Sequence, residues 1–367
     1  MKIAVVVPGG VDRSGEVRVV PALLALLKRL AVRHEVHVFA LWQETEPGEW
    51  WLLGARVHNA GGHRMALIQL RTVGAIAREH WRGRFDLVQA IWSGACGTVA
   101  ITAAKLLGLR SAVHVAGGEL VALHDIGYGG RQGLRGRLRE TWVLRSADAL
   151  TAASQPILDQ LAALGHTGLR LALGVDLDVW PPQQPRRREP GEPLRLVQVA
   201  SINRVKDQTC LLQALALTET ATELDLIGED TLSGELQALA ARLGVAQRVR
   251  FHGFMTQAAL QPLLARAHLH LITSRHEAGP LAVLEAAVQG VPSLGTKVGH
   301  LAEWAPHAAL VVSPGDAAGL AALIARVAAD EDMRLQLARE AQRRALAEDA
   351  DQCHARFERL YAELLGC

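Results

Sequence analysis

The sequence is short of lysine and of cysteine, and each shortage excludes a class of protein. Five of the 39 basic residues are lysine, and 37 acidic residues balance the basic total to a formal net charge of +2. A chain so close to neutral lacks the broad basic surface that nucleic-acid binding requires. The cysteines form no CxxC pair and have no histidine at metal-finger spacing, which favours unpaired thiols in a reducing compartment. They are Cys96, Cys210, Cys353 and Cys367.

Long apolar runs are absent as well. No segment approaches the roughly 20 apolar residues that span a bilayer. The first ten residues contain one lysine, the short run IAVVV and then Pro-Gly-Gly. This stretch is too short for a signal peptide and predicts a first β-strand instead. We therefore expect a cytoplasmic protein, and peripheral contact with the inner membrane stays open.

Short apolar runs that alternate with longer helical patterns are plentiful. Because runs that are apolar throughout suit strands covered on both faces, they predict parallel sheets built from βαβ units. A leucine-rich pattern over Pro21–Leu30 is typical of the helices between them. The ten runs are Ile3–Val7, Val36–Phe39, Leu87–Ile91, Ala112–Val115, Ala149–Thr151, Leu194–Ala200, Leu224–Ile227, Val249–Phe251, Leu269–Thr273 and Ala309–Val312.

A linker divides the chain near its middle. Asp178–Pro193, DVWPPQQPRRREPGEP, is crowded with proline and arginine and has no periodicity. At 367 residues the chain exceeds what one core usually supports. We therefore predict two doubly wound α/β domains, residues 1–177 and 194–348, joined by residues 178–193. Residues 330–365 are expected to form two charged helices. The second of these, in residues 349–367, is counted separately from the two domains.

The most informative stretch is Ser274–Pro292, SRHEAGPLAVLEAAVQGVP. It follows an expected strand, with Pro280 suited to the first helical position. Glu277 and Gly279 then lie on a loop, and Glu285 lies inside an apolar helix, where a buried carboxylate needs hydrogen-bond partners. Those partners are ligand hydroxyls or, alternatively, structural groups. The free amides at Leu281 form an anion site for a diphosphate.

With these residues the stretch resembles the signature of retaining glycosyltransferases of family 4, which have the GT-B fold. The resemblance implies two Rossmann-like domains facing a central cleft, with the C-terminal helix returning to the N-terminal domain. It also implies that Glu277 contacts the sugar of a nucleotide-sugar donor and that Glu285 holds the ribose hydroxyls.

The segment LRLVQVASINRVKDQ, residues 194–208, resembles the first strand and basic loop of the family's donor domain. Lys206 falls where the family places a lysine on the donor diphosphate, and its cation would offset charge on the leaving group. The alternative is a solvated surface lysine. Ser201 stands where many members have a second arginine, and we consider Arg204 as its substitute.

The N-terminal domain offers two glycine-containing loops. PGGVDRSGE, with Gly10 and Gly15, resembles the family's loop near donor and acceptor, although a tight turn without a ligand is the alternative. Glu16 stands where a phosphate loop requires lysine, which disfavours an NTPase. After the run Ala112–Val115, Gly118 and Glu119 are candidate acceptor contacts, and Glu119 has helix capping as its alternative.

The family's histidine at that second loop is replaced by Ala116, which puts the role of that side chain in doubt. Arg131, Arg135, Arg137, Arg139 and Arg145 surround a predicted helix that meets either anionic lipid or only solvent.

Together these features predict a retaining hexosyltransferase that uses a nucleoside-diphosphate sugar and a hydroxyl acceptor, either a glycan, a lipid-linked sugar or a small metabolite. Synthesis of cell-surface polysaccharide or glycolipid is the expected setting. No cofactor and no metal are expected, because no Asp-x-Asp motif stands at a plausible place for a diphosphate-bound metal, apart from Asp176-Leu-Asp178 beside the linker. A non-catalytic nucleotide-sugar-binding protein and a GT-B epimerase remain alternatives. A Rossmann dehydrogenase is disfavoured by the missing G-x-G-x-x-G.

Overall fold

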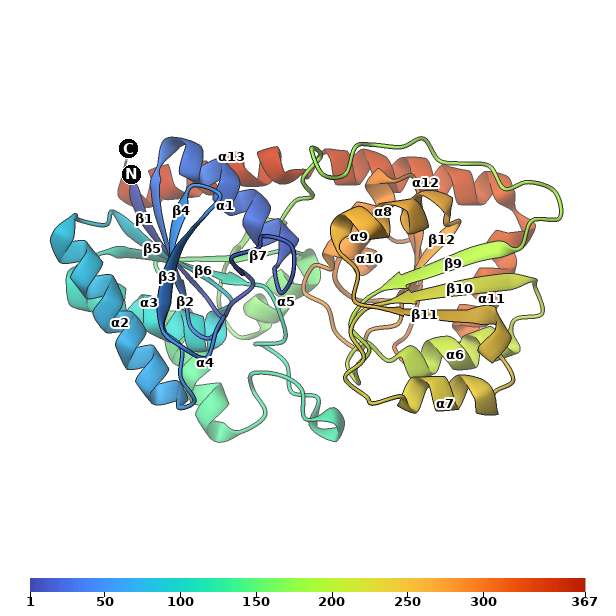
Figure 1. Cartoon of the computed structure of the whole chain (residues 1–367), viewed down its shortest axis with the longest axis horizontal. Coiled ribbons are helices and arrows are strands. Elements are labelled where there is room, and N and C mark those ends of the chain that lie inside the picture. The colour runs from blue at the N-terminus through green and yellow to red at the C-terminus, as the bar shows by residue number, and fades with distance from the viewer. Residues whose placement is uncertain (367) are drawn as a thin grey trace. The chain divides into compact units, whose positions relative to one another are not determined.

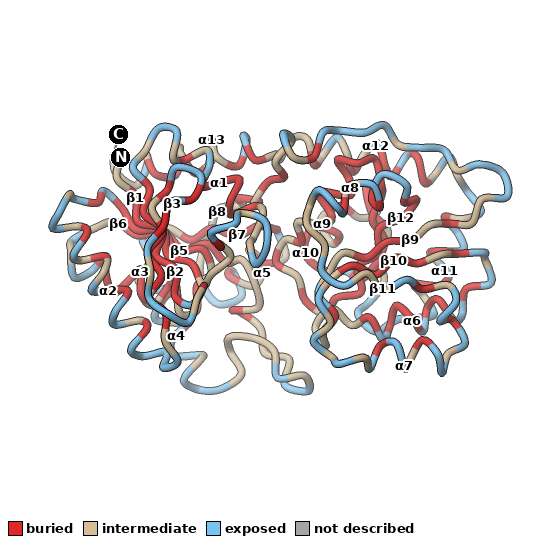
Figure 2. Tube along the Cα trace, in the orientation of Figure 1, coloured by how far each residue is buried: buried red, intermediate tan, exposed pale blue. Residues whose placement is uncertain are grey.

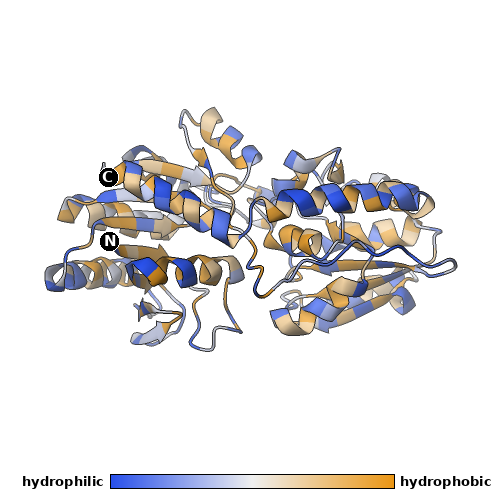
Figure 3. Ribbon diagram, turned by 90° about the horizontal axis from the view of Figure 1, so that it is seen from above, coloured by the Kyte–Doolittle hydropathy of each residue, from blue (hydrophilic) through white to orange (hydrophobic). Residues whose placement is uncertain are grey.

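The computed structural model describes residues 1–366, which form two compact units. Unit 1 contains Met1–Gly174 together with the segment that begins at Ala350, and unit 2 contains Val175–Asp349. In each unit helices cover both faces of a sheet (Figure 1). The strands are the most buried parts of the trace (Figure 2), and apolar residues concentrate in them while the helices carry both kinds of residue (Figure 3).

Unit 1 has a sheet in the order β3-β4-β2-β1-β5-β6-β7-β8, and its pairs are parallel except for antiparallel β3 and β4. The strands are β1 (Lys2–Val7), β2 (Glu35–Ala40), β3 (Gly48–Leu52), β4 (Ala55–Asn59), β5 (Leu87–Ile91), β6 (Arg110–Val115), β7 (Ala149–Ala152) and β8 (Leu169–Arg170). The helices are α1 (Pro21–Arg33), α2 (Met65–Arg82), α3 (Thr98–Leu107), α4 (Leu134–Ser146), α5 (Gln155–Ala163) and α13 (Ala350–Leu365), with short turns η1 (Ser93–Gly97) and η2 (His124–Ile126).

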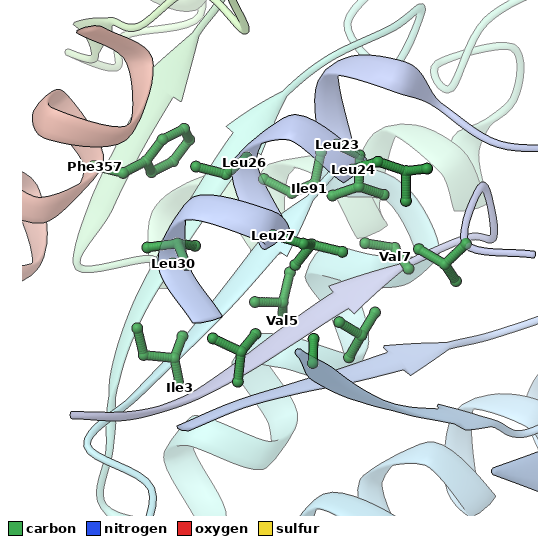
Figure 4. Close-up of a cluster of buried hydrophobic side chains, with 14 of the residues drawn as sticks. Ile3, Val5, Val7, Leu23, Leu24, Leu26, Leu27, Leu30, Ile91 and Phe357 are labelled. Atoms are coloured by element: carbon green, nitrogen blue, oxygen red, sulfur yellow. The ribbon is translucent and has the colours of Figure 1, made fainter. Parts of the chain in front are cut away.

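The C-terminal helix α13 completes the core of unit 1. Alternate residues of β1 face α1, and α13 packs beside α1 on the same face of the sheet. Figure 4 shows Phe357 of α13 directed at Leu26 of α1, over Ile3 and Val5 of β1. Phe357 and Tyr361 are fully buried. The predicted return of the C-terminal helix to the N-terminal domain is therefore confirmed.

Unit 2 has a fully parallel sheet in the order β11-β10-β9-β12-β13-β14. Helices α6, α7 and α11 cover one face, and α8, α9, α10 and α12 cover the other. The strands are β9 (Leu194–Val199), β10 (Thr222–Ile227), β11 (Val249–Gly253), β12 (Leu269–Ile272), β13 (Ser293–Thr296) and β14 (Ala309–Val312). The helices are α6 (Gln208–Leu217), α7 (Glu235–Arg242), α8 (Gln257–Arg266), α9 (Leu281–Val288), α10 (Gly299–Trp304), α11 (Ala317–Ala329) and α12 (Glu331–Leu346), with the turn η3 (Ala246–Arg248).

The predicted fold class is confirmed, since two parallel α/β sheets are present, and each of the ten apolar runs overlaps a strand. Four strands were not predicted: β3, β4, β8 and β13. Three of the cysteines, at positions 96, 210 and 353, are buried and form no disulfide, and Cys367 lies outside the described residues. Over residues 1–366, no helix combines the length and the apolar character needed to cross a membrane.

The segment between the two sheets has no regular structure but is bound to unit 2. Arg334 of α12, only 1% exposed, donates to the carbonyl oxygen of Arg186 in this segment and to that of His268 at 3.1 Å. The Gln183 amide donates to the Val288 carbonyl at 3.0 Å. The unit boundary lies at Gly174 and Val175, so these residues belong to unit 2.

Candidate active site

The carboxyl ends of β9 and β12 bring Lys206 and Glu277 together. These two strands are neighbours, and chain order reverses between them, which is where open α/β sheets bind ligands. Lys206 follows β9, Glu277 follows β12, and the Lys206 Nζ atom forms an ion pair with Glu277 Oε1. The Ser274 hydroxyl donates to the same oxygen at 2.6 Å. Both charged side chains are partly exposed, 24% for Lys206 and 11% for Glu277, so a ligand can reach them.

The two loops that carry this pair are tied by their backbones. The Thr273 hydroxyl donates to the Lys206 carbonyl at 2.9 Å, and the Arg275 amide donates to the Val205 carbonyl at 2.8 Å. Within the first loop, Asn203 Oδ1 accepts from the Lys206 amide at 3.0 Å. These bonds fix the backbone positions of Lys206 and of the loop that carries Glu277. The loops therefore hold the pair in place before a ligand binds.

Glu285 lies in α9, as predicted, and is 5% exposed. Burial raises the pKa of its carboxyl to about 7, although hydrogen bonds from the side chains of Gln257 and Trp180 oppose the shift. The bond from Gln257 Nε2 to Glu285 Oε1 measures 3.0 Å. A carboxyl with so few protein donors keeps acceptor positions for a ligand's hydroxyl groups.

The first turn of α9 is open to an anion. Pro280 was expected to be the first helical residue, but it is the N-cap residue, and the helix begins at Leu281. Its side chain makes no capping hydrogen bond. The Val283 amide donates to the Pro280 carbonyl at 3.1 Å, and the helix dipole at the preceding amides of Leu281 and Ala282 favours a negative charge. Gly279 is partly exposed beside them. Gly299 approaches closely from α10, since a Cβ there would lie 2.8 Å from Pro280 Cδ and 3.2 Å from Glu277 Cβ.

Arg204 occupies a different environment from the other predicted donor residues. Its guanidinium lies 3.3 Å from Glu235 of α7, and both side chains are well exposed, at 58% and 60%. Ser201, where the family often has arginine, is also exposed. The structure thus pairs Arg204 with Glu235 on the surface, and its role toward a donor stays a prediction.

The loop after β1 contains Gly10 and Gly15, and both have the left-handed backbone that glycine tolerates, with φ of 80° and 69°. A Cβ at Gly10 would lie 2.6 Å from Val20 Cγ2. Asp12 organises the loop: burial raises its pKa, but hydrogen bonds from Ser14 and Arg18 prevail and lower it. This loop follows one of the two strands at the switch between β1 and β5 in unit 1.

Glu119 is turned into its own loop. One carboxylate oxygen accepts from the Ser93 amide at 3.0 Å and the other from the Gly117 amide at 2.7 Å. Burial raises the pKa of Glu119, against the effect of these amides. The side chain therefore holds the loop after β6. Neighbouring Gly118 leaves room for Tyr128, because a Cβ there would meet its ring at 2.4 Å.

Sequence reasoning missed Trp92, which follows β5. Its φ of 75° is a left-handed backbone conformation that a bulky side chain rarely adopts. The next residue anchors it, because the Ser93 hydroxyl donates to fully buried Glu140 at 2.7 Å. Strain of this kind clusters at ligand sites, and Trp92 directly follows β5, the strand that pairs with β1 at the switch point. No residue pattern around it signalled the conformation.

Two family models match the chain, one in each half. Residues 14–173 match the glycosyl transferase 4-like domain, and residues 181–344 match glycosyl transferases group 1. Glycogen synthase of Mycobacterium tuberculosis H37Rv is 32% identical over 219 residues, which cover 58% of this chain and 53% of that protein. The chain thus spans about half the length of the curated relatives that it matches.

Solved structures share the whole fold. Sucrose-phosphate synthase from Thermosynechococcus elongatus has a TM-score of 0.84 at 19% identity, over 100% of this chain and 99% of that one. Anabaena HepE, solved in complex with UDP-glucose, has a TM-score of 0.75 at 21% identity, over 99% of this chain and 100% of its own. At such identities the likeness establishes the architecture.

Proposed function

Since this chain belongs to the family 4 glycosyltransferases with the GT-B fold, we propose that it transfers a hexose, with retention, from a nucleoside-diphosphate sugar to a hydroxyl acceptor. The observation that carries the proposal is the Lys206–Glu277 ion pair at the switch point of unit 2. UDP-glucose is the first donor to test, because HepE, which shares the architecture, has been solved with it.

Departure of the nucleoside diphosphate is the step that Lys206 and α9 assist. Negative charge grows on the leaving phosphate as the bond to the sugar breaks, and cations or aligned amides placed beforehand lower the barrier. Lys206 supplies the ammonium, and the uncapped first turn of α9 supplies amides. On this view the donor diphosphate takes Lys206 from Glu277, which releases the carboxylate toward the sugar hydroxyls. Transfer then needs no metal ion.

Recognition of the nucleotide falls to Glu285. Glu285 is the fifth of the eight residues of α9, the helix whose first amides would meet the diphosphate. Two ribose hydroxyls would donate to its oxygens and replace the water that such a buried acceptor otherwise needs. We name no protein nucleophile for the retaining reaction.

The acceptor is proposed to be a lipid-linked glycan reached at a membrane surface. Leu134, Leu138 and Trp142 recur every four residues on α4 and are 66%, 61% and 38% exposed. Exposed arginines at positions 135, 137, 139 and 145 accompany this apolar row. An apolar row among cations suits the interface of an anionic bilayer. Co-sedimentation with anionic vesicles, lost in Leu138→Glu, tests it; equal sedimentation by both proteins would contradict it.

The decisive experiment combines binding with product analysis. A ligand at a hundredfold its dissociation constant adds about 2.7 kcal/mol to the free energy of unfolding, so a panel of nucleoside diphosphates and their sugars should reveal the donor base by thermal shift. NMR of the product's anomeric proton should then show the donor's configuration retained. Binding without turnover would favour the non-catalytic alternative, and no shift with any nucleotide would refute the donor site.

A further inference from the structure

A buried cluster in unit 1 contains two histidines and a glutamate from three different elements. His37 lies on β2, His58 on β4 and Glu79 on α2. Their side chains are 5%, 5% and 2% exposed, and one ligand atom from each lies within 4.8 Å of the other two. Imidazole nitrogens and carboxylate oxygens are the ligands of zinc and similar divalent metals.

The outer nitrogen of each imidazole already meets a carboxylate. His37 Nε2 lies 2.9 Å from Glu35 Oε1, and His58 Nδ1 lies 3.1 Å from Glu49 Oε1. Metal-binding histidines are held this way, because a carboxylate fixes the tautomer and directs the other nitrogen at the metal. Both imidazoles of the cluster thus have the surroundings expected of ligands.

The inner nitrogens face each other, with His37 Nδ1 3.0 Å from His58 Nε2. A neutral imidazole has a single N–H. If each ring donates it outward to its carboxylate, two lone pairs are left opposed at that distance. A metal ion bound to both nitrogens removes this conflict.

We propose that His37 Nδ1, His58 Nε2 and the Glu79 carboxylate bind a divalent transition metal of the zinc class. Two imidazole nitrogens on one tetrahedral zinc lie about 3.3 Å apart, so binding requires a small opening and reorientation of the pair. Water can complete the coordination from an adjoining cavity of about 400 Å³ that His58 and Glu49 line.

Basic side chains form ion pairs with the carboxylates in and around the cluster. Arg82 lies 2.7 Å from Glu79, Arg56 lies 2.7 Å from Glu49, and Lys2 lies 3.0 Å from Glu35. Arg78 lies 3.6 Å from both Glu79 and Glu49. The three arginines are 34% to 60% exposed, so they can turn to solvent when the metal takes Glu79.

The role of the metal is structural. Its ligands join β2 and β4 to α2, and both histidines lie within their strands, since His37 is the third of six residues of β2 and His58 the fourth of five of β4. Small-molecule ligands of such sheets bind beyond the carboxyl ends of the strands. The proposal is therefore independent of the glycosyl-transfer proposal, which needs only Lys206, Glu277 and α9 of unit 2.

The test uses the full chain, with any affinity tag removed, after dialysis against chelator. Addition of Zn²⁺ should give one bound equivalent and raise the thermal midpoint, and Co²⁺ should give the visible absorption of a tetrahedral site. His58→Gln and Glu79→Gln should each weaken binding at least tenfold. Glu49→Gln, which removes only the outer carboxylate, should weaken it roughly 10- to 100-fold.

His63→Gln removes an exposed histidine just before α2 and is the matched control, which should bind like the original protein. A cooperative thermal transition in chelator, with a midpoint close to that of the chelator-treated original protein, shows in each variant that the chain is folded. Absence of Zn²⁺ binding by the original protein would overturn the proposal. So would equal binding by His58→Gln and Glu79→Gln, because the metal would then lie elsewhere.

Discussion

Buried and half-buried carboxylates in this chain are held in different ways, and the difference decides what each can do. Glu119 accepts from the amides of its own loop, so it supports the backbone. Glu277 is paired with a lysine that a phosphate can capture. Glu285 accepts from the side chains of Gln257 and Trp180 and has a raised pKa, so it retains capacity for a ligand. The chemistry of a carboxylate therefore follows from its partners.

Glu277→Gln should lower kcat by roughly a hundredfold and change UDP affinity little, since the amide keeps the size of the side chain but loses the charge that Lys206 and the sugar meet. Steady-state kinetics and UDP titration measure the two effects separately. Glu235→Gln is the control, because it removes an exposed carboxylate that faces Arg204. Unchanged turnover in Glu277→Gln would mean that this residue has no part in transfer.

Glu285→Gln should stabilise the unliganded protein at high pH. The folded pKa of about 7 lies above the ordinary value of 4.5, so the carboxyl costs nothing below pH 4.5 and destabilises the fold as pH rises through 7. About 2.5 pKa units correspond to roughly 3 kcal/mol at pH 8. Denaturant unfolding of the original protein and of Glu285→Gln at pH 5 and pH 8 measures this difference in the free energy of unfolding. An equal difference between the two proteins at both pH values would contradict the assignment.

The resemblance placed Lys206 at the donor diphosphate and Glu277 at the donor sugar, and the structure joins the two side chains in an ion pair. Arg204 instead faces Glu235, because a loop's direction is set by backbone bonds that residue types do not specify. Trp92 was missed, since its positive φ leaves no mark on the sequence.

At the scale of helices and strands, the amino-acid composition of a segment decided whether the segment was predicted as a strand. The ten predicted runs all became strands whose faces are covered by helices, and of these β11 and β14 lie at the edges of the sheet in unit 2. Strands β3 and β4 mix charged, aromatic and apolar residues at one edge of the sheet, and β13 is the short run SLGT. The histidine cluster was not predicted either, because it depends on the pairing of β2 with β4, a strand that the sequence did not predict.

Helix α13 should contribute strongly to the stability of unit 1. Phe357→Ala removes a fully buried ring between α13 and α1, and such truncations cost about 3–5 kcal/mol. Chemical denaturation measures the loss, and Arg359→Ala, on the exposed side of the same helix, should change stability by less than about 0.5 kcal/mol. A small effect at Phe357 would mean that α13 is dispensable to this core.

At the scale of the whole molecule, the chain crosses between its units twice, at Gly174–Val175 and at Asp349–Ala350. Each unit nevertheless has its own sheet and core. The proposed donor residues all lie in unit 2 and the proposed metal ligands all lie in unit 1. A bound nucleotide and a bound metal ion should therefore protect different segments of the chain from hydrogen exchange.

Hydrogen exchange should show that separation. A nucleoside diphosphate should slow exchange in residues 200–207 and 274–282, because these segments carry Lys206, Glu277 and the first amides of α9. Chelator should leave that protection unchanged, since the diphosphate is neutralised by Lys206 and amides. Zn²⁺ should instead slow exchange in β2, β4 and α2. Loss of nucleotide protection with chelator would show that the donor requires a metal, and the proposed role of Lys206 as its counter-ion would then fail.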